Sequence, residues 1–236
     1  MGTLVDDAEG PNGDTPLHMA SEGGHVAVMK KLLDRGADPN KYSQFSGLVI
    51  SVAISSGKIG AVELLAAQKG FVLLPERDDI ESPLVQAAAM SDISMFEYLL
   101  DKFKSSIPTE EYGKALASAA GAGRIDIFDR LLRREYSHQD FQYALQCATE
   151  NSKWDIINII LETCGGLNCD DTFVQAAADP ESKNDFLDRL WAYTRGAISQ
   201  YKLNESLYHA TDREKIDTVA VLLQKYRADA NATGPE

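Results

Sequence analysis

The chain has 236 residues, of which 44% are hydrophobic, and a formal net charge of −13 at pH 7. This apolar content is sufficient for a sizeable core and excludes an intrinsically disordered chain. The negative charge disfavours direct binding to nucleic acids and to anionic membrane surfaces, and it attracts basic partners at long range.

The ends and the cysteines indicate the compartment. No apolar run approaches the roughly 20 residues that a membrane helix needs. Residues 1–14, MGTLVDDAEGPNGD, lack the basic and apolar regions of a signal peptide. The three cysteines, Cys147, Cys164 and Cys169, are too few for a disulfide framework. We therefore expect a protein of the cytoplasm or the nucleus that is not attached to a membrane.

The first segment with a distinct pattern is GDTPLHMASEGGHVAVMKKLLDRGADPN, at residues 13–40. It begins with TPLHMA, continues through the turn at Gly24 and His25 and the pair Leu32 and Leu33, and closes with GADPN. This segment resembles the ankyrin repeat over nearly its whole length. The resemblance implies a helix–turn–helix unit with a β-hairpin finger.

Weaker copies follow at the spacing of this family. A small alanine marks the centre of the first helix in each copy, and a large apolar residue precedes it by three positions, about one helical turn. A larger residue at the marker would overpack the stack, because neighbouring helices approach closely there. The marker alanines are Ala20, Ala53, Ala87, Ala119, Ala148, Ala176 and Ala210. Their positions differ by 33, 34, 32, 29, 28 and 34, and the ankyrin period is about 33.

Each copy also contains an apolar ladder for its second helix, with spacings that place side chains on one helix face. The ladder of the third copy contains Ile93, Met95, Phe96 and Leu99. The ladder is thinner in the second copy, and residues 179–184 form an apparent insertion before the ladder of the sixth. A generic helical bundle would contain amphipathic helices, but it would not repeat both markers in register.

The two markers together predict an all-α ankyrin-repeat solenoid of about seven helix–turn–helix units with short or degenerate β-hairpin fingers. We expect a single ankyrin-repeat domain over residues 1–236. The last copy closes with RADAN, residues 227–231, as an internal repeat does, so we expect the natural chain to continue further. The predicted repeats are 11–43, 44–77, 78–109, 110–138, 139–166, 167–200 and 201–231.

Nothing in the sequence predicts catalysis. His18, His25 and His209 are assigned structural roles, with His209 placed at the repeat position of His18. Cys164 and Cys169 are too far apart for a CxxC pair, and no second pair completes a zinc site. No serine, histidine and carboxylate set falls on aligned repeat positions. We therefore expect no enzymatic activity, no cofactor and no bound metal.

The resemblance implies a protein-interaction module or scaffold, because ankyrin repeats usually bind partners at the fingers and the exposed side of the first helices. Carboxylates at these positions in the third to sixth copies favour a partner with a basic segment, with apolar side chains as anchors. We expect the chain to be monomeric by itself. The predicted contact residues are Phe45, Asp78, Asp79, Glu81, Met90, Glu110, Glu111, Asp140 and Glu150.

Two alternatives stay open. The carboxylates can be ordinary solvated surface, and Glu110 and Glu111 can stabilise the amino terminus of their own helix. A second function, as an enzyme or small-molecule binder, would use a pocket at the irregular sixth copy near Trp191, Tyr193 and Tyr208. A deep cavity with buried polar groups would favour this second function, and a shallow open groove would favour protein binding.

Overall fold

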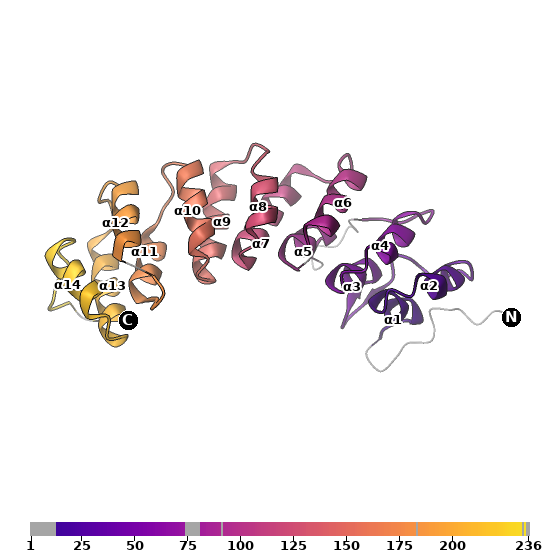
Figure 1. The fold of residues 1–236 in the computed structure, drawn as a ribbon, viewed down its shortest axis with the longest axis horizontal. Helices are drawn as coiled ribbons and strands as arrows, with labels where there is room; N and C mark the ends of the chain where they lie inside the picture. Colours follow the sequence, from indigo (N-terminus) through magenta and orange to yellow (C-terminus); the bar gives the residue numbers. More distant parts are fainter. Residues whose placement is uncertain (1–12, 74–80, 91, 183, 233, 235–236) are drawn as a thin grey trace. The chain divides into compact units, whose positions relative to one another are not determined.

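The computed structural model describes residues 13–73, 81–90, 92–182, 184–232 and 234 (Figure 1). These residues form fourteen helices and one two-stranded antiparallel hairpin. The predicted all-α fold is therefore confirmed. The chain divides into two compact units, residues 1–115 and 116–236. The single domain and the repeat bounds stay predictions.

The first unit is built from helix pairs, each joined by a short turn (Figure 1). Its elements are α1 (Pro16–Glu22), α2 (Val26–Leu33), β1 (Tyr42–Ser43), β2 (Gly47–Leu48), α3 (Val49–Ser55), α4 (Ile59–Ala66), α5 (Pro83–Met90) and α6 (Ile93–Phe103). α1 packs against α3, α3 packs against α5, and α2 packs against α4. In the hairpin, Tyr42 lies opposite Leu48, and this hairpin is the predicted finger before the second copy.

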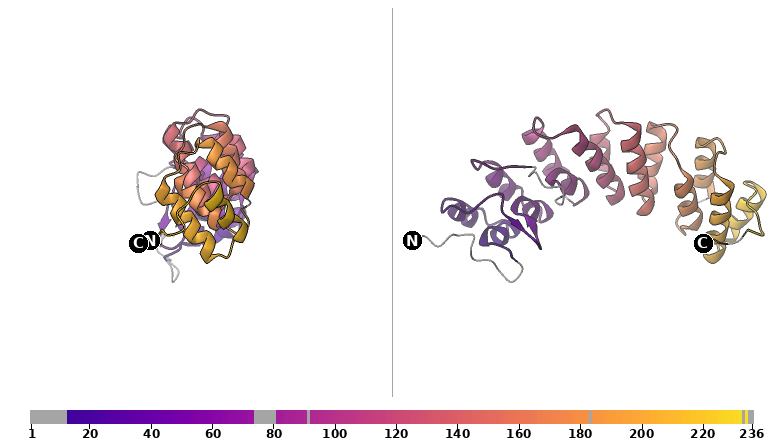
Figure 2. Two further views of the ribbon diagram at one scale, coloured as in Figure 1. Left: turned by 90° about the vertical axis from the view of Figure 1, so that its left-hand side faces the viewer. Right: turned by 180° about the vertical axis from the view of Figure 1, so that it is seen from behind.

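The second unit repeats the same arrangement, and its pairs lie side by side in two views (Figure 1 and Figure 2). Its helices are the end of α7 (Thr109–Ala122), α8 (Ile125–Leu131), α9 (His138–Glu150), α10 (Trp154–Thr163), α11 (Asp170–Ala178), α12 (Asn184–Tyr193), α13 (Gln200–Asp212) and α14 (Ile216–Gln224). The first helices α9, α11 and α13 pack in succession, and α12 packs against α14. Each apolar stripe is thus covered by the next pair, as stacked repeats require.

The marker alanines are buried in all seven repeats, and five of them share one hydrogen-bond position. All seven are buried, with at most 4% of each residue exposed. The N–H of His25 donates to the carbonyl of Ala20 at 2.8 Å, which closes the first helix in the manner of a Schellman motif. The same bond, at 2.8–2.9 Å, joins Lys58, Arg124, Lys153 and Lys215 to Ala53, Ala119, Ala148 and Ala210. The register inferred from sequence is therefore confirmed at these five copies.

The turn between the two helices of a pair has a recurring left-handed residue. The fourth residue after the marker alanine has a positive φ in five copies. In three copies this residue is glycine, whereas Ser152 (φ 53°) and Glu214 (φ 55°) take the position in two others. A non-glycine residue in this region carries a steric cost. The turn geometry is therefore imposed by the packing of the helix pair and not by the residue present.

The second-helix ladders form much of the core, but their first members do not. Met95, Phe96 and Leu99 are buried in α6, as expected. Val26 and Ile216, each the first residue of its helix, are exposed instead. A helical side chain covers the turn on the amino-terminal side of its own Cα. The first residue of a helix has no such turn, so its side chain extends into solvent.

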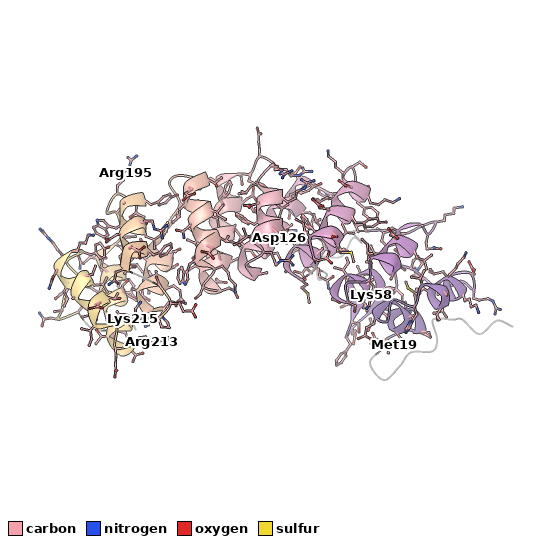
Figure 3. The ribbon with its side chains drawn as sticks, viewed as in Figure 1. Met19, Lys58, Asp126, Arg195, Arg213 and Lys215 are labelled. Atoms are coloured by element: carbon pink, nitrogen blue, oxygen red, sulfur yellow. The ribbon has the colours of Figure 1, made fainter. Side chains whose placement is uncertain are left out.

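The sixth pair contains the predicted insertion. α11 ends at Ala178 and α12 begins at Asn184, whereas residues 213–215 alone connect α13 to α14. The ammonium of Lys215, labelled in Figure 3, donates to the carbonyls of Asp179 at 2.7 Å and Ala176 at 3.4 Å. This cation therefore satisfies carbonyl groups at the end of α11, and it ties the insertion to the following pair.

The structural role of His18 is confirmed, whereas the equivalence of His209 was wrong. The N–H of Thr15 donates to His18 Nδ1 at 3.2 Å, and His18 Nε2 lies 3.2 Å from the carbonyl oxygen of Gly47. His18 thus connects α1 to the hairpin of the next copy. His209 directly precedes its marker Ala210, whereas His18 lies two residues before its own marker. The two histidines therefore occupy different repeat positions.

The alanine positions lead to a stability prediction. Ala119→Leu should lower the free energy of unfolding by about 1–3 kcal/mol, because the larger side chain overpacks the contact between first helices. Ala122→Leu is the matched control, since Ala122 is exposed in the last turn of the same helix, and it should change stability by less than about 0.5 kcal/mol. Urea unfolding followed by circular dichroism measures both, and equal effects would contradict the packing role of Ala119.

The turn geometry leads to a second prediction, in which two substitutions change the stability in opposite directions. Glu214→Gly should stabilise the chain by about 0.5 kcal/mol, because relief of left-handed strain exceeds the added chain entropy of glycine. Gly123→Ala, at φ 75°, should destabilise it by a similar amount of about 0.5 kcal/mol or more, for the same reason. Thermal unfolding of both variants measures the signs. A loss of stability in Glu214→Gly would refute the strain at this turn.

Candidate functional site

The first helices of the pairs carry few cations. α1, α3, α5, α9 and α11 contain no lysine or arginine. Lys114 in α7 and Lys202 in α13 are the lysines found on the remaining first helices. The carboxylates on the first helices are Glu22, Glu110, Glu111, Asp140, Glu150, Asp170, Asp171, Glu205 and Asp212. The first helices of the first pair and of the fourth to seventh pairs are therefore acidic, whereas α3 and α5 contain no charged residue.

Both lysines are held by neighbouring carboxylates. Lys114 Nζ lies 2.8 Å from Glu110 Oε1 and 3.0 Å from Glu111 Oε1. Hydrogen bonds to Glu110 and then to Glu111 raise the pKa of Lys114 to about 12. Lys202 Nζ lies 2.8 Å from Asp171 Oδ1, and it also contacts a glutamate of its own helix. The predicted contact residues Glu110 and Glu111 thus already have a cation from their own helix.

Asp140 has a structural role at the start of its helix. The N–H and the hydroxyl of Ser137 donate to Asp140 Oδ2 at 2.9 and 2.7 Å, and the N–H of Asp140 donates to Ser137 Oγ at 3.2 Å. These reciprocal bonds form a capping box at the amino terminus of α9. The predicted contact residues Asp78 and Asp79 lie outside the described residues.

Besides Glu110, which is exposed although it pairs with Lys114, four predicted contact residues are exposed. Phe45 is 79% exposed in the turn of the hairpin, and Met90 is 61% exposed as the last residue of α5. Glu81 and Glu150 are also exposed, and desolvation raises the pKa of Glu81. The sequence prediction missed Met19 of α1, labelled in Figure 3, which is 59% exposed. Its position directly before a marker alanine was readable from the repeat register.

The first unit contains a small groove between first helices, named here the α1–α3 groove, of about 190 Å³. Asp14, Met19 and Glu22 line it, together with Ser46 of the finger. The Ser46 hydroxyl donates to Asp14 Oδ2 at 2.9 Å. Hydrogen bonds from Ser43 and, to a smaller extent, Ser46 lower the pKa of Asp14, so this carboxylate stays charged. The groove therefore combines negative charge with an exposed apolar side chain.

The second unit contains a larger hollow, the α9–α11 groove, of about 330 Å³. Its lining residues are Gln142, Leu145, Gln146, Thr149 and Glu150 of α9, Asn168 before α11, and Asp171, Thr172 and Gln175 of α11. Thr149 Oγ1 and Thr172 Oγ1 lie 2.9 Å apart and are hydrogen-bonded in its floor. Of the predicted contact residues, Glu150 lies in this groove, whereas Asp140 does not line it.

The region of the sixth copy does not bring its predicted residues into one cavity. A hollow of about 700 Å³ is lined by Tyr193 and the loop around Leu167. The Tyr193 hydroxyl donates to the carbonyl of Cys164 at 2.6 Å and accepts the N–H of Leu167 at 3.0 Å, so its role is structural. The ring centroid of Trp191 lies 4.7 Å from that of Tyr226 in a packed aromatic pair. Tyr208 is half exposed on α13.

The described residues contain no group of three or more histidine, cysteine, aspartate or glutamate side chains arranged to hold a metal ion. All three cysteines are free thiols. Burial, followed by the charge of Asp170, raises the pKa of Cys169 to about 12. A thiol of such high pKa is a poor nucleophile. Among the described helices, none is long and apolar enough to cross a membrane.

Comparison with known proteins agrees with the register of the first copy. The family model for the ankyrin repeat matches residues 12–43. Over 167 residues, 70% of this chain, the sequence is 25% identical to ankyrin repeat and KH domain-containing protein mask-1 of Caenorhabditis elegans. Over 131 residues, 55% of this chain, it is 27% identical to neurogenic locus notch homolog protein 1 of Xenopus laevis. Each match spans 5% of the relative's own length.

A solved structure has a similar fold. The crystal structure of the human ASB11 ankyrin repeat domain matches this chain with a TM-score of 0.58. The match covers 76% of this chain and 84% of the solved chain, at 19% sequence identity. At this identity the likeness concerns the arrangement of helices alone.

The hydroxyl pair in the floor of the α9–α11 groove leads to a third prediction. Thr149→Val and Thr172→Val should each lower the free energy of unfolding by about 1 kcal/mol, because each leaves one buried hydroxyl without its partner. The double variant should lose less than the sum of the single losses, since it leaves no unpaired hydroxyl. Urea unfolding of the four proteins measures the coupling. Additive losses would show that the two hydroxyls do not interact.

Proposed function

The chain is an ankyrin-repeat protein, and on this premise we propose that it binds a basic segment of another protein on the finger and first-helix side. Ankyrin repeats are generally protein–protein interaction modules, and stacked repeats present an extended surface for such contacts. The observation that carries the proposal is the charge of the first helices. Their lysines in the described residues, Lys114 and Lys202, are both held by carboxylates.

The exposed apolar side chains support the same surface. In the first unit, Met19 lies beside the carboxylates of the α1–α3 groove, and Phe45 lies on the adjacent finger. Met90 ends a first helix in the same unit. Large side chains that can be buried by a partner supply most of the affinity of protein interfaces. Surrounding charges mainly set the association rate and the choice of partner.

We expect no catalysis, a monomer in isolation, and a place in the cytoplasm or nucleus. The contacts of the sixth copy give no support to the alternative of an enzyme or small-molecule binder. The Tyr193 hydroxyl is engaged with main-chain groups, and Trp191 packs against Tyr226. The buried, weakly acidic thiol of Cys169 likewise offers no nucleophile.

Charge reversal on the first helices tests the proposal. Peptides enriched from a random display library by the intact chain should be rich in lysine and arginine. The double variant Glu22→Lys with Glu150→Lys should bind them about tenfold more weakly, with a smaller dependence on salt. Isothermal titration calorimetry at about 50 mM and about 200 mM salt measures the affinity and its dependence on salt.

A second double variant controls for net charge. Asp101→Lys with Glu162→Lys makes the same change of charge on exposed positions of the second helices α6 and α10. This control should keep the affinity of the unaltered chain. Equal loss in both double variants would show that only net charge matters, and enrichment of acidic or purely apolar peptides would refute a basic partner.

A further inference from the structure

The α9–α11 groove has one wall fixed by contacts across the repeat boundary. Gln142 Nε2 donates to the carbonyl of Asn168 at 3.0 Å, and the N–H of Asn168 donates to Gln142 Oε1 at 2.8 Å. Asn168 Oδ1 in turn accepts the N–H of Asp170 at 2.9 Å. The amide groups at this end are therefore committed to holding the loop before α11. The groove is thus preformed, which reduces the ordering cost of binding.

The groups left open in the groove are mainly acceptors. Gln146 Nε2 donates to Glu150 Oε1 at 2.9 Å, which leaves the Gln146 carbonyl oxygen and Glu150 Oε2 open. Lys202 approaches Asp171 at Oδ1, which leaves Oδ2 open. In the described part of the chain, no hydrogen-bond partner of these three oxygen atoms is recorded. Glu150 on α9 has a neutral amide as its recorded partner among the described residues, whereas Asp171 on α11 shares the cation of Lys202, so each wall presents a carboxylate oxygen and the α9 wall carries the uncompensated charge.

The floor of the groove contains two buried hydroxyl groups that can also contact a ligand. Thr149 and Thr172 are 6% and 3% exposed, and both line the groove. Their two hydroxyls carry two hydrogens, but the bond between them uses one. Within the described residues no acceptor for the second hydrogen is recorded, so this buried donor is available to a ligand. A main-chain carbonyl of an incoming peptide can accept it, and the remaining lone pairs of the hydroxyls can accept N–H groups.

We infer that the α9–α11 groove binds one arginine side chain of the partner, an inference that rests on the proposed function. A guanidinium presents five N–H donors in a planar fork, which can bridge acceptors on two facing walls, whereas an ammonium is a point charge. The volume of about 330 Å³ is at the lower end for small-molecule sites and suits a single side chain.

Nuclear magnetic resonance titration of the intact chain tests this inference. The probe is the blocked tripeptide acetyl-Gly-Arg-Gly-amide, compared with the same peptide containing citrulline or lysine. Citrulline keeps the shape of arginine but lacks its charge. Only the arginine peptide should produce large saturable shifts of the Gln146 and Gln175 side-chain amide signals. Citrulline or lysine shifting these signals equally would overturn the inference, as would the absence of saturable shifts with arginine.

Conservative variants locate the contact. Glu150→Gln and Asp171→Asn should each weaken binding of the arginine tripeptide roughly tenfold, because each removes a charge-assisted hydrogen bond. Glu162→Gln, on the exposed side of α10, is the matched control and should bind as the unaltered chain does. Unchanged affinity in both groove variants would overturn the assignment. Amide spectra that retain the dispersion of the unaltered chain show that each variant is folded.

The two proposals fail in different ways. If the chain selects basic peptides and the Glu22→Lys, Glu150→Lys variant loses them, but the arginine tripeptide does not bind the groove, then the inference fails and the proposed function stands. If no basic peptide is enriched, the proposed function fails, whatever the tripeptide does. Binding of the tripeptide alone would then identify a site for free arginine-like cations and would equally overturn the assignment to a partner protein.

Discussion

The close approach of neighbouring first helices at the marker alanines is the constraint on which the rest of the structure depends. A buried alanine and a buried apolar residue three positions earlier fix one face of each first helix. Positions just before the marker and two after it are not fixed by this contact. In α1 these positions hold Met19 and Glu22, and both line a groove. Stacking thus separates the residues that determine the fold from those that are free to determine binding.

The carboxylates on the first helices fall into two groups, those that stabilise the chain and those that remain open to a partner. Glu110 and Glu111 share the single cation of Lys114, and Asp140 caps α9, so these carboxylates are already engaged within or next to their own helices. Glu150 accepts a hydrogen bond from a neutral amide and keeps its charge uncompensated by a cation in the described contacts. A count of acidic residues therefore overstates the binding potential of the surface. The relevant quantity is the number of carboxylates that no neighbouring group of the chain already engages as an ion pair or helix cap.

The repeat register was predictable because identical packing demands recur at a fixed period, and two markers reported it independently. The engagement of Glu110, Glu111 and Asp140 was also readable, since Lys114 follows Glu110 by four residues and Ser137 precedes Asp140 by three. The α9–α11 groove was not predictable. It depends on contacts between Gln142 and Asn168 across two divergent copies, where the sequence pattern does not fix the positions of loops.

The position of the α9–α11 groove follows from one pair of repeat positions. The residue after each marker lies near the residue four before the next marker. Ser21 Oγ donates to the carbonyl of Val49 at 3.1 Å in the first unit, and Thr149 meets Thr172 in the second. Thr149 and Thr172 both line the α9–α11 groove. Ile54 holds the same position in the second copy and is fully buried. Polar groups tolerate partial hydration whereas apolar groups favour close packing, so the polar pair Thr149 and Thr172 allows α9 and α11 to leave a groove that a partner can enter.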